Sequence, residues 1–183
     1  MERGTLMISE SRYWKQPLLR SASWLERWRM SEENFERDSA RIERELFIGF
    51  YAIRKLFDTF KVSLDTRRKY YPLIWSPKIG RPDYFNWHRI EEHFDLETRN
   101  EETRDLVFLC NQFIHSFIFT VATDENNAFA GVFIASDKAR NDRLYFVAAS
   151  QIFLAFRTVG RDYPVRQHMI RNDRTGEWEE SAT

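Results

Sequence analysis

LVFLCNQFIHSFIFTVAT, residues 106–123, is the longest uncharged stretch of the chain, and the expected fold is built around it. Its apolar residues recur at three- and four-residue steps, which is the period of an α-helix. Asn111 and His115 are four residues apart, so a helix would place them one turn apart on the same side. Thr98 and Glu101 have the spacing of a capping box just before it. The stretch therefore predicts a central helix with two polar side chains on one side.

The same stretch is almost long enough to cross a membrane, since a span needs about 20 apolar residues. However, an Asn, a Gln and a His within five positions would be costly in hydrocarbon. Asp105 and Asp124 also stand at its two ends. We therefore expect a helix inside a soluble domain and no membrane partner.

Composition sets further bounds on the 183-residue chain, whose length fits one domain. Its 28 basic and 28 acidic residues give a net charge of zero, which disfavours binding of nucleic acid by bulk electrostatics but leaves a local basic patch open. The single Cys excludes an internal disulfide, and the N-terminal MERGTLMISE lacks the apolar core of a secretory signal. Both observations favour a cytoplasmic protein.

A second long helix is expected over about residues 31–60. Ser31 suits an N-cap, Glu32 and Glu33 suit the first turn, and apolar residues then continue at helical spacing. Arg54 and Lys55 interrupt the apolar half of this helix. They are either a solvated edge or a pair of cations that faces a polar site.

The remaining segments are shorter. Residues 70–75 contain and precede prolines and fit a loop or an edge strand. Residues 129–135 and 144–148 read as the two strands of a hairpin, and residues 152–159 read as a short final helix. Together these patterns predict a mainly α (α+β) fold, a helical bundle around two long antiparallel helices with a small β-hairpin near 129–148 and a short C-terminal helix.

Three regions follow from these assignments. Residues 31–164 form the helical domain, and residues 165–183 form a C-terminal tail with little periodicity. Residues 1–30 form an aromatic amphipathic segment that either packs on the body or docks another chain, because Trp and Tyr anchor interfaces. The aromatic residues in this segment are Tyr13, Trp14, Trp24 and Trp28.

Two chemical sites are disfavoured by geometry. His88 and His93 are five residues apart, so on a helix they would point about 140° apart rather than converge on a metal. Cys110 and His115 have the same spacing and could not form a nucleophilic dyad within one helix. Cys110 is then a small buried hydrophobe. We expect neither a metal site nor a cofactor.

Two segments resemble the HEPN superfamily (higher eukaryote and prokaryote nucleotide-binding domains). They are ELFIGFYAIRKLFD, residues 45–58, and CNQFIHS, residues 110–116. The family motif is an Arg, usually followed by a polar residue, with a His four to six residues beyond the Arg. Asn111 and His115 fall on the polar and His positions, whereas Cys110 occupies the Arg position. The resemblance covers residues 33–122.

This resemblance implies a helical bundle that dimerises, and in many members a metal-independent ribonuclease. The expected function is thus a component of a bacterial toxin–antitoxin or antiviral defence module that binds or cleaves RNA. In that role His115 would be the general acid/base, Asn111 would orient it, and Arg54 or Lys55 would meet the phosphate.

The alternative is a non-catalytic interaction or regulatory subunit, because Cys110 cannot supply the guanidinium of the motif. Asn111 and His115 would then be a hydrogen-bonded pair between helices that fixes their register or a dimer interface. Tyr13, Trp14, Trp24 and Trp28 would hold a partner. Either way we expect a homodimer or a subunit of a protein complex, and RNA is a partner only in the first case.

Overall fold

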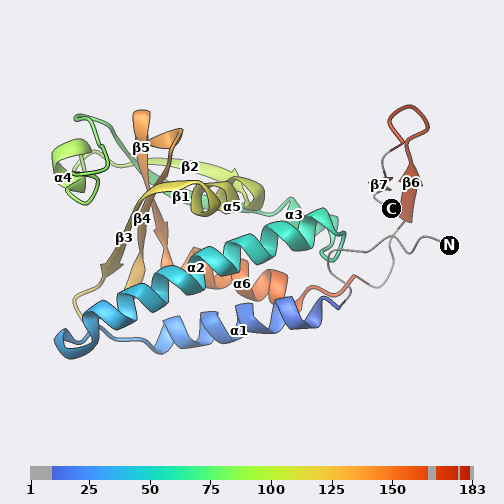
Figure 1. The fold of residues 1–183 in the computed structure, drawn as a ribbon, viewed down its shortest axis with the longest axis horizontal. Helices are drawn as coiled ribbons and strands as arrows, with labels where there is room; N and C mark the ends of the chain where they lie inside the picture. Colours follow the sequence, from blue (N-terminus) through green and yellow to red (C-terminus); the bar gives the residue numbers. More distant parts are fainter. Residues whose placement is uncertain (1–9, 165–167, 177, 182–183) are drawn as a thin grey trace.

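An antiparallel sheet of five strands, in the order β2-β1-β5-β4-β3, forms the centre of the computed structural model (Figure 1). The structure describes residues 10–164, 168–176 and 178–181. The predicted helical bundle is wrong, because this α+β fold packs its helices on a sheet. The sheet strands are β1 (Tyr70–Pro77), β2 (Asn100–Asp105), β3 (Ser116–Thr123), β4 (Phe129–Ser136) and β5 (Arg143–Ala148).

Six α-helices and two short 3-10 helices lie before, between and after the strands of the sheet in the described residues. The α-helices are α1 (Arg12–Arg27), α2 (Phe35–Asp58), α3 (Leu64–Arg67), α4 (Ile90–His93), α5 (Leu106–Ile114) and α6 (Ala149–Arg161). Two short 3-10 helices are η1 (Glu32–Asn34) and η2 (Ala139–Asn141), and a separate hairpin is made by β6 (His168–Arg171) and β7 (Trp178–Ser181). That hairpin lies in the predicted tail, of which residues 165–167, 177 and 182–183 lie outside the described part, as do residues 1–9 of the N-terminal segment.

The predicted central helix is only half as long as expected. Helix α5 ends at Ile114, and residues 116–123 form β3, which pairs with β4 with Thr120 opposite Phe133. The reason is composition, because the second half is rich in aromatic and β-branched residues that favour a strand. The helix also begins later than the capping box suggested. Its cap is Asp105, whose Oδ1 accepts a hydrogen bond from the Phe108 N–H at 2.7 Å, and Glu101 lies in β2.

Several other elements agree with the sequence. The long helix is confirmed as α2, preceded by η1, although the Ser31 side chain makes no capping hydrogen bond. The hairpin is confirmed as β4 and β5, and the final helix as α6. The segment 70–75, expected as a loop or edge strand, is instead part of the interior strand β1. Pro72 is tolerated there because β5 pairs with β1 only from Ile74 onward, so Pro72 has a strand neighbour on one side alone.

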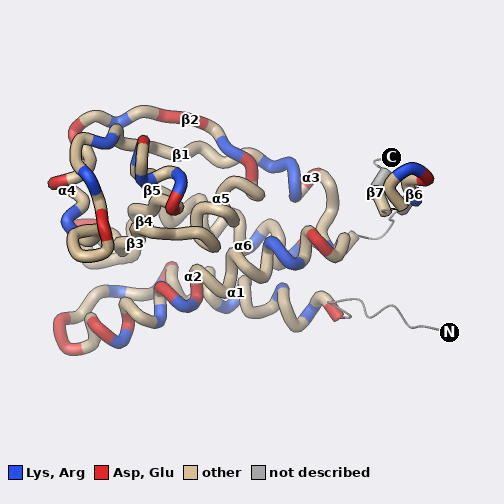
Figure 2. Tube along the Cα trace, turned by 45° about the horizontal axis from the view of Figure 1, so that its top comes forward, with Lys and Arg blue, Asp and Glu red and all other residues tan. Residues whose placement is uncertain are grey.

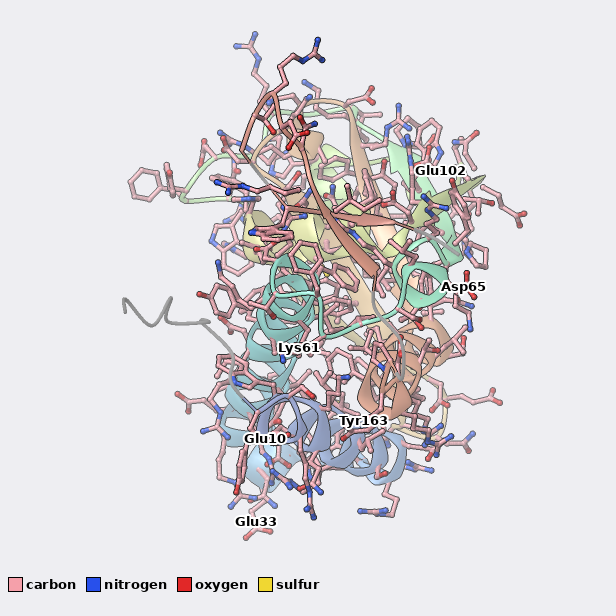
Figure 3. All side chains as sticks on the ribbon, turned by 90° about the vertical axis from the view of Figure 1, so that its right-hand side faces the viewer. Glu10, Glu33, Lys61, Asp65, Glu102 and Tyr163 are labelled. Carbon is pink, nitrogen blue, oxygen red and sulfur yellow. The ribbon has the colours of Figure 1, made fainter. Side chains whose placement is uncertain are left out.

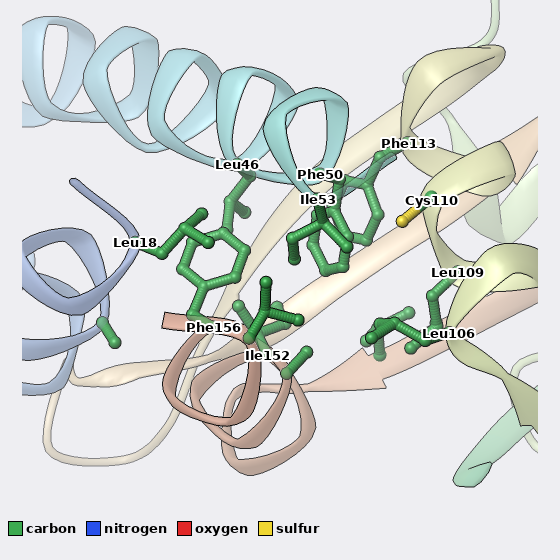
Figure 4. Packing of buried hydrophobic residues seen from close by; sticks show 14 of the residues in the cluster. Leu18, Leu46, Phe50, Ile53, Leu106, Leu109, Cys110, Phe113, Ile152 and Phe156 are labelled. Atoms are coloured by element: carbon green, nitrogen blue, oxygen red, sulfur yellow. The ribbon is translucent and has the colours of Figure 1, made fainter. Parts of the chain in front are cut away.

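Helices α1, α2, α5 and α6 cover one face of the sheet (Figure 1). Phe50 lies at the centre of this core, where its ring stacks on Phe113 with centroids 3.9 Å apart and contacts Phe156 at 5.2 Å. Figure 4 shows Leu18, Phe50 and Phe156 pointing toward one another from three helices. Segment 1–30 therefore contributes to the main core through α1.

The opposite face of the sheet has a smaller core. Val132 and Ile134 of β4 face the helices, whereas Ala135 contacts the segment that carries α4. This second cluster consists of Ile90, Phe94, Ile118, Ala135 and Leu144. The segment between β1 and β2 thus covers one end of the second face.

Lys15 anchors the start of α1 although its side chain is completely buried. Its Nζ donates to the carbonyl of Lys61 at 2.6 Å and to the carbonyl of Asp162. It also lies 4.3 Å from the centroid of the Tyr163 ring. Burial lowers the pKa of Lys15, partly offset by the nearby charge of Asp162. The buried amine ties α1 to the chain segments that follow α2 and α6.

Gly49→Ala tests the close approach of α2 to α6. A Cβ at this position would lie 2.3 Å from Cζ of Phe156, whose ring is completely buried, so the ring or the helix would have to shift. Overpacking should therefore cost roughly 1–3 kcal/mol. This exceeds the gain of about 1 kcal/mol that Gly-to-Ala normally brings in a helix, so the variant should be less stable than wild type. Urea denaturation measures the change, with the exposed Glu43→Ala on the same helix as control. A Gly49→Ala protein as stable as wild type would contradict this packing.

Candidate functional site

The side chains of Asn111 and His115 lie one turn apart on the exposed side of α5. The backbone N–H of His115 donates to the Asn111 carbonyl at 3.1 Å and closes the last turn. Within the described part of the chain, neither side chain has a hydrogen-bond partner. The predicted buried pair that fixes helix register is therefore wrong for the single chain, since both groups face solvent.

Arg54 and Lys55 lie on α2, the helix against which α5 packs. Both approach the carboxylate of Asp58, Arg54 at 3.6 Å and Lys55 at 3.7 Å. These two cations are thus already paired within their own helix. Cys110 is buried in the core between α2 and α5, and burial raises the pKa of its thiol. The thiol is therefore neutral and enclosed, as expected of a small hydrophobe.

The four predicted partner-binding aromatics separate into two groups. Tyr13 is 77% exposed, and Trp14 and Trp24 are half-buried on the surface of α1. Trp28 is only 6% exposed and donates its Nε1–H to Asp38 at 3.1 Å. The prediction that Trp28 contacts a partner is wrong, because its ring is buried in the core of the chain itself.

Tyr13 and Trp14 line a recess between α1 and α2 with a volume of about 370 Å³. The opposite wall is α2, where Ile48 is 58% exposed. The remaining lining residues are mostly small or apolar and comprise Pro17, Leu18, Ser21, Glu45, Gly49 and Ala52. Two helices therefore present a largely apolar hollow to solvent.

A second recess of about 340 Å³ adjoins the first, because Ile48 lines both. Its walls are Phe47 and Tyr51 from α2, and Phe113, Ile114 and Ser116 at the end of α5. His115 follows Ile114 and therefore stands beside this recess. We call the two recesses together the outer apolar face.

Ile48 and Tyr51 were not among the candidate site residues expected from the sequence. The buried stripe of α2 includes Leu46, Phe50 and Ile53. At 100° per residue, Ile48 and Tyr51 fall outside this stripe, on the side of the helix that points away from the core. Their exposure therefore follows from the periodicity, but only the packing of α1 and α5 beside α2 shows that they line recesses.

A polar cluster centred on Glu102 of β2 lies on the sheet, away from α1 (Figure 3). Its carboxylate accepts hydrogen bonds from Arg104 at 2.8 Å, Arg143 at 3.1 Å and the Tyr145 hydroxyl at 2.7 Å. Burial raises the pKa of Glu102, but the hydrogen bonds from Arg104 and Tyr145 outweigh it and the net pKa is lowered. The contacts within this cluster join β2 to β5 across β1, so its role is to hold the sheet edge.

Tyr145→Phe tests this cluster. At pH 7 the loss of a hydrogen bond to an ionised carboxylate should lower the free energy of unfolding by about 1.5–3 kcal/mol. Burial, together with the hydrogen bond to Glu102, raises the pKa of Tyr145 to about 12. The unfolded chain then loses this proton first, near pH 10. Wild-type stability should fall as the pH rises from about 10 to 12, and the fall should be shallower in the variant.

Chemical denaturation at several pH values measures both effects, with Tyr70→Phe as the control because the Tyr70 ring is 65% exposed. If stability depended on pH identically in wild type and Tyr145→Phe, the role given to the Tyr145–Glu102 hydrogen bond would be contradicted.

Comparison with known proteins adds no family to this description, since no family model, curated protein or solved structure matches the chain. None of the helices in the described residues has the length and apolarity needed to cross a bilayer. Across residues 10–164, 168–176 and 178–181, no group of three or more His, Cys, Asp or Glu side chains could hold a metal ion. The functional proposal therefore rests on the surface of the fold alone.

Proposed function

We propose that the protein is a non-catalytic binding subunit that holds a partner protein against the outer apolar face of α1, α2 and α5. The observation that carries this proposal is the joined pair of recesses, rimmed by the exposed side chains of Tyr13, Ile48 and Tyr51. Contiguous exposed apolar side chains of this kind mark protein interaction sites.

The chemistry of the rim supports the same proposal. Tyrosine and tryptophan bring large rigid contact areas to an interface at low entropic cost, and they dominate binding energy where they occur. Here they stand on two helices held in place by the Phe50 core and by Lys15. A surface mounted on rigid helices loses little conformational freedom when a partner binds.

A photo-crosslinking residue at position 48 tests the proposal in the cells that naturally produce the protein. The partner should give one dominant adduct, because position 48 lies between the two recesses. The adduct should disappear when Tyr13 is also changed to Asp. Binding of the partner would then bury an unpaired carboxylate, which is strongly unfavourable. The control carries the photo-crosslinker at exposed Thr103 of β2. Adducts no stronger at 48 than at 103, or unaffected by Tyr13→Asp, would refute the proposal.

The second candidate function is binding or cleavage of RNA, as the HEPN resemblance implies, and the toxin–antitoxin or antiviral setting is a prediction within it. One observation favours this candidate, namely that Asn111 and His115 are accessible on one side of α5 with unused side chains. Their residue types and spacing suit proton transfer to and from a ribose hydroxyl. The paired state of Arg54 and Lys55 and the absence of a bundle weigh against it.

Incubation of labelled single-stranded RNA with wild type and His115→Ala distinguishes this candidate. The imidazole is exposed and makes no hydrogen bond or ion pair with the described residues, so the substitution should change the free energy of unfolding by less than about 0.5 kcal/mol. Under this candidate the wild type cleaves the RNA and the folded variant does not. Intact RNA with both proteins, or equal cleavage by both, would exclude His115 as the acid/base.

A further inference from the structure

The apolar recess between α1 and α2 continues into a third recess of about 700 Å³ farther along the same two helices. The two share Pro17, Ser21 and Glu45, so they form one groove. The character of the lining changes along its length. The Tyr13 end is apolar, whereas the other end carries Trp24 with Arg20, Arg27 and Arg41. Figure 2 marks the basic residues on both helices.

The three arginines of this basic end have no ionic partner among the residues that the structure describes. Across the described residues, none of Arg20, Arg27 and Arg41 makes an ion pair or a side-chain hydrogen bond. Arg41 stacks its guanidinium over the Trp24 ring at 3.9 Å from the centroid, which fixes its direction but leaves its N–H donors unused. Elsewhere arginines are commonly paired, for example Arg157 with Glu26 and Arg143 with Glu102.

The one carboxylate that lines the groove is already bonded to other side chains of the described chain. Glu45 is the only acidic residue that lines the basic end. Its Oε2 accepts the Ser21 hydroxyl at 2.5 Å, and its Oε1 accepts from Arg44 at 3.2 Å. The single carboxylate is therefore already engaged, and three guanidinium groups remain for an anionic ligand.

We propose that this groove binds an acidic amphipathic segment of a partner protein. This inference rests on the proposed function above. The apolar side chains of the segment lie between Tyr13, Trp14 and Ile48. Its carboxylates meet Arg20, Arg27 and Arg41, and bidentate pairing of Arg with carboxylate fixes its direction. From Tyr13 to Arg27 the groove follows nearly the whole of α1, a length of about 21 Å at 1.5 Å per residue, which matches a helical segment of similar length.

A nucleic acid fits the groove less well than an acidic peptide. A phosphate backbone presents negative charge along its whole length, whereas half of this groove is apolar. The chain also has a net charge of zero, so it gains no long-range attraction for a polyanion. A segment that is apolar at one end and acidic at the other uses both halves.

Selection of displayed random 16-residue peptides on the full-length protein tests the inference. The enriched peptides should combine aromatic or aliphatic residues at one end with two or more Asp or Glu at the other. The best synthetic peptide, followed by fluorescence anisotropy, should lose affinity about tenfold or more for Arg41→Glu and for Arg20→Glu. Arg68→Glu is the matched control, because this exposed arginine at the C-cap of α3 does not line the groove and its substitution makes the same change in net charge.

No enriched peptide, enrichment without acidic residues, or equal affinity for wild type and Arg41→Glu would overturn the inference. Peptides that lack acids but lose affinity for Ile48→Asp would overturn it while leaving the proposed partner-binding face intact. An oligouridine 16-mer that displaces the peptide and binds more tightly, with the same dependence on Arg41, would assign the groove to nucleic acid instead. No adduct at position 48 would count against the proposed function itself.

Discussion

The stack of Phe50 on Phe113 is the contact on which the arrangement of the helices depends. The ring centroids are 3.9 Å apart and the rings are nearly parallel, at 10°. The Phe50 ring also contacts Phe156 of α6, with centroids 5.2 Å apart. Phe50 thus joins α2 to both helices that follow strands of the sheet. Gly49 beside it leaves the space into which the Phe156 ring projects. The inner side of α2 is fully used by these contacts, and its outer side is left to α1 and solvent.

The short length of α5 opens the rest of the surface. Because the chain turns at His115 and enters β3, no helical residue continues along Phe47 and Tyr51 beyond Ile114. At the other end, α1 is fixed by the buried Lys15 and by the contact of Leu19 with Gly160 of α6. Helix α1 therefore packs closely on α6, and a groove remains between α1 and α2. The same contacts that bury the core leave Tyr13, Ile48 and the three arginines of the groove uncovered.

Local patterns predicted the elements in which one periodicity dominates. Helix α2, the β4–β5 hairpin and α6 carry clear helical or strand spacing between turn residues. Strand β3 was missed because a continuous apolar run fits a helix and a buried strand equally well, and no Gly or Pro separates Ile114 from Ser116. Strand β2 reads NEETRD and has no apolar alternation, so only its pairing with β1 reveals it.

The same limit applies to the candidate site. Tyr13, Trp14 and Trp24 could be named from composition, but which of the neighbouring Trp residues is buried depends on the contact of Trp28 with Asp38. Arg20, Arg27 and Arg41 have no sequence motif, and they converge only because α1 and α2 lie side by side (Figure 1). The groove is a product of packing between two helices, and single-residue patterns do not encode such a feature.

The surface of the molecule depends on the turn at His115, where the chain leaves α5 and continues as β3, the edge strand of the sheet. Nuclear Overhauser contacts of residues 116–123 test it most directly. We expect cross-strand contacts to β4, with Thr120 facing Phe133 and Val121 facing Val132, and strong sequential Hα–HN contacts typical of a strand. Contacts between residues three apart through 116–121, typical of a continued helix, would contradict the account.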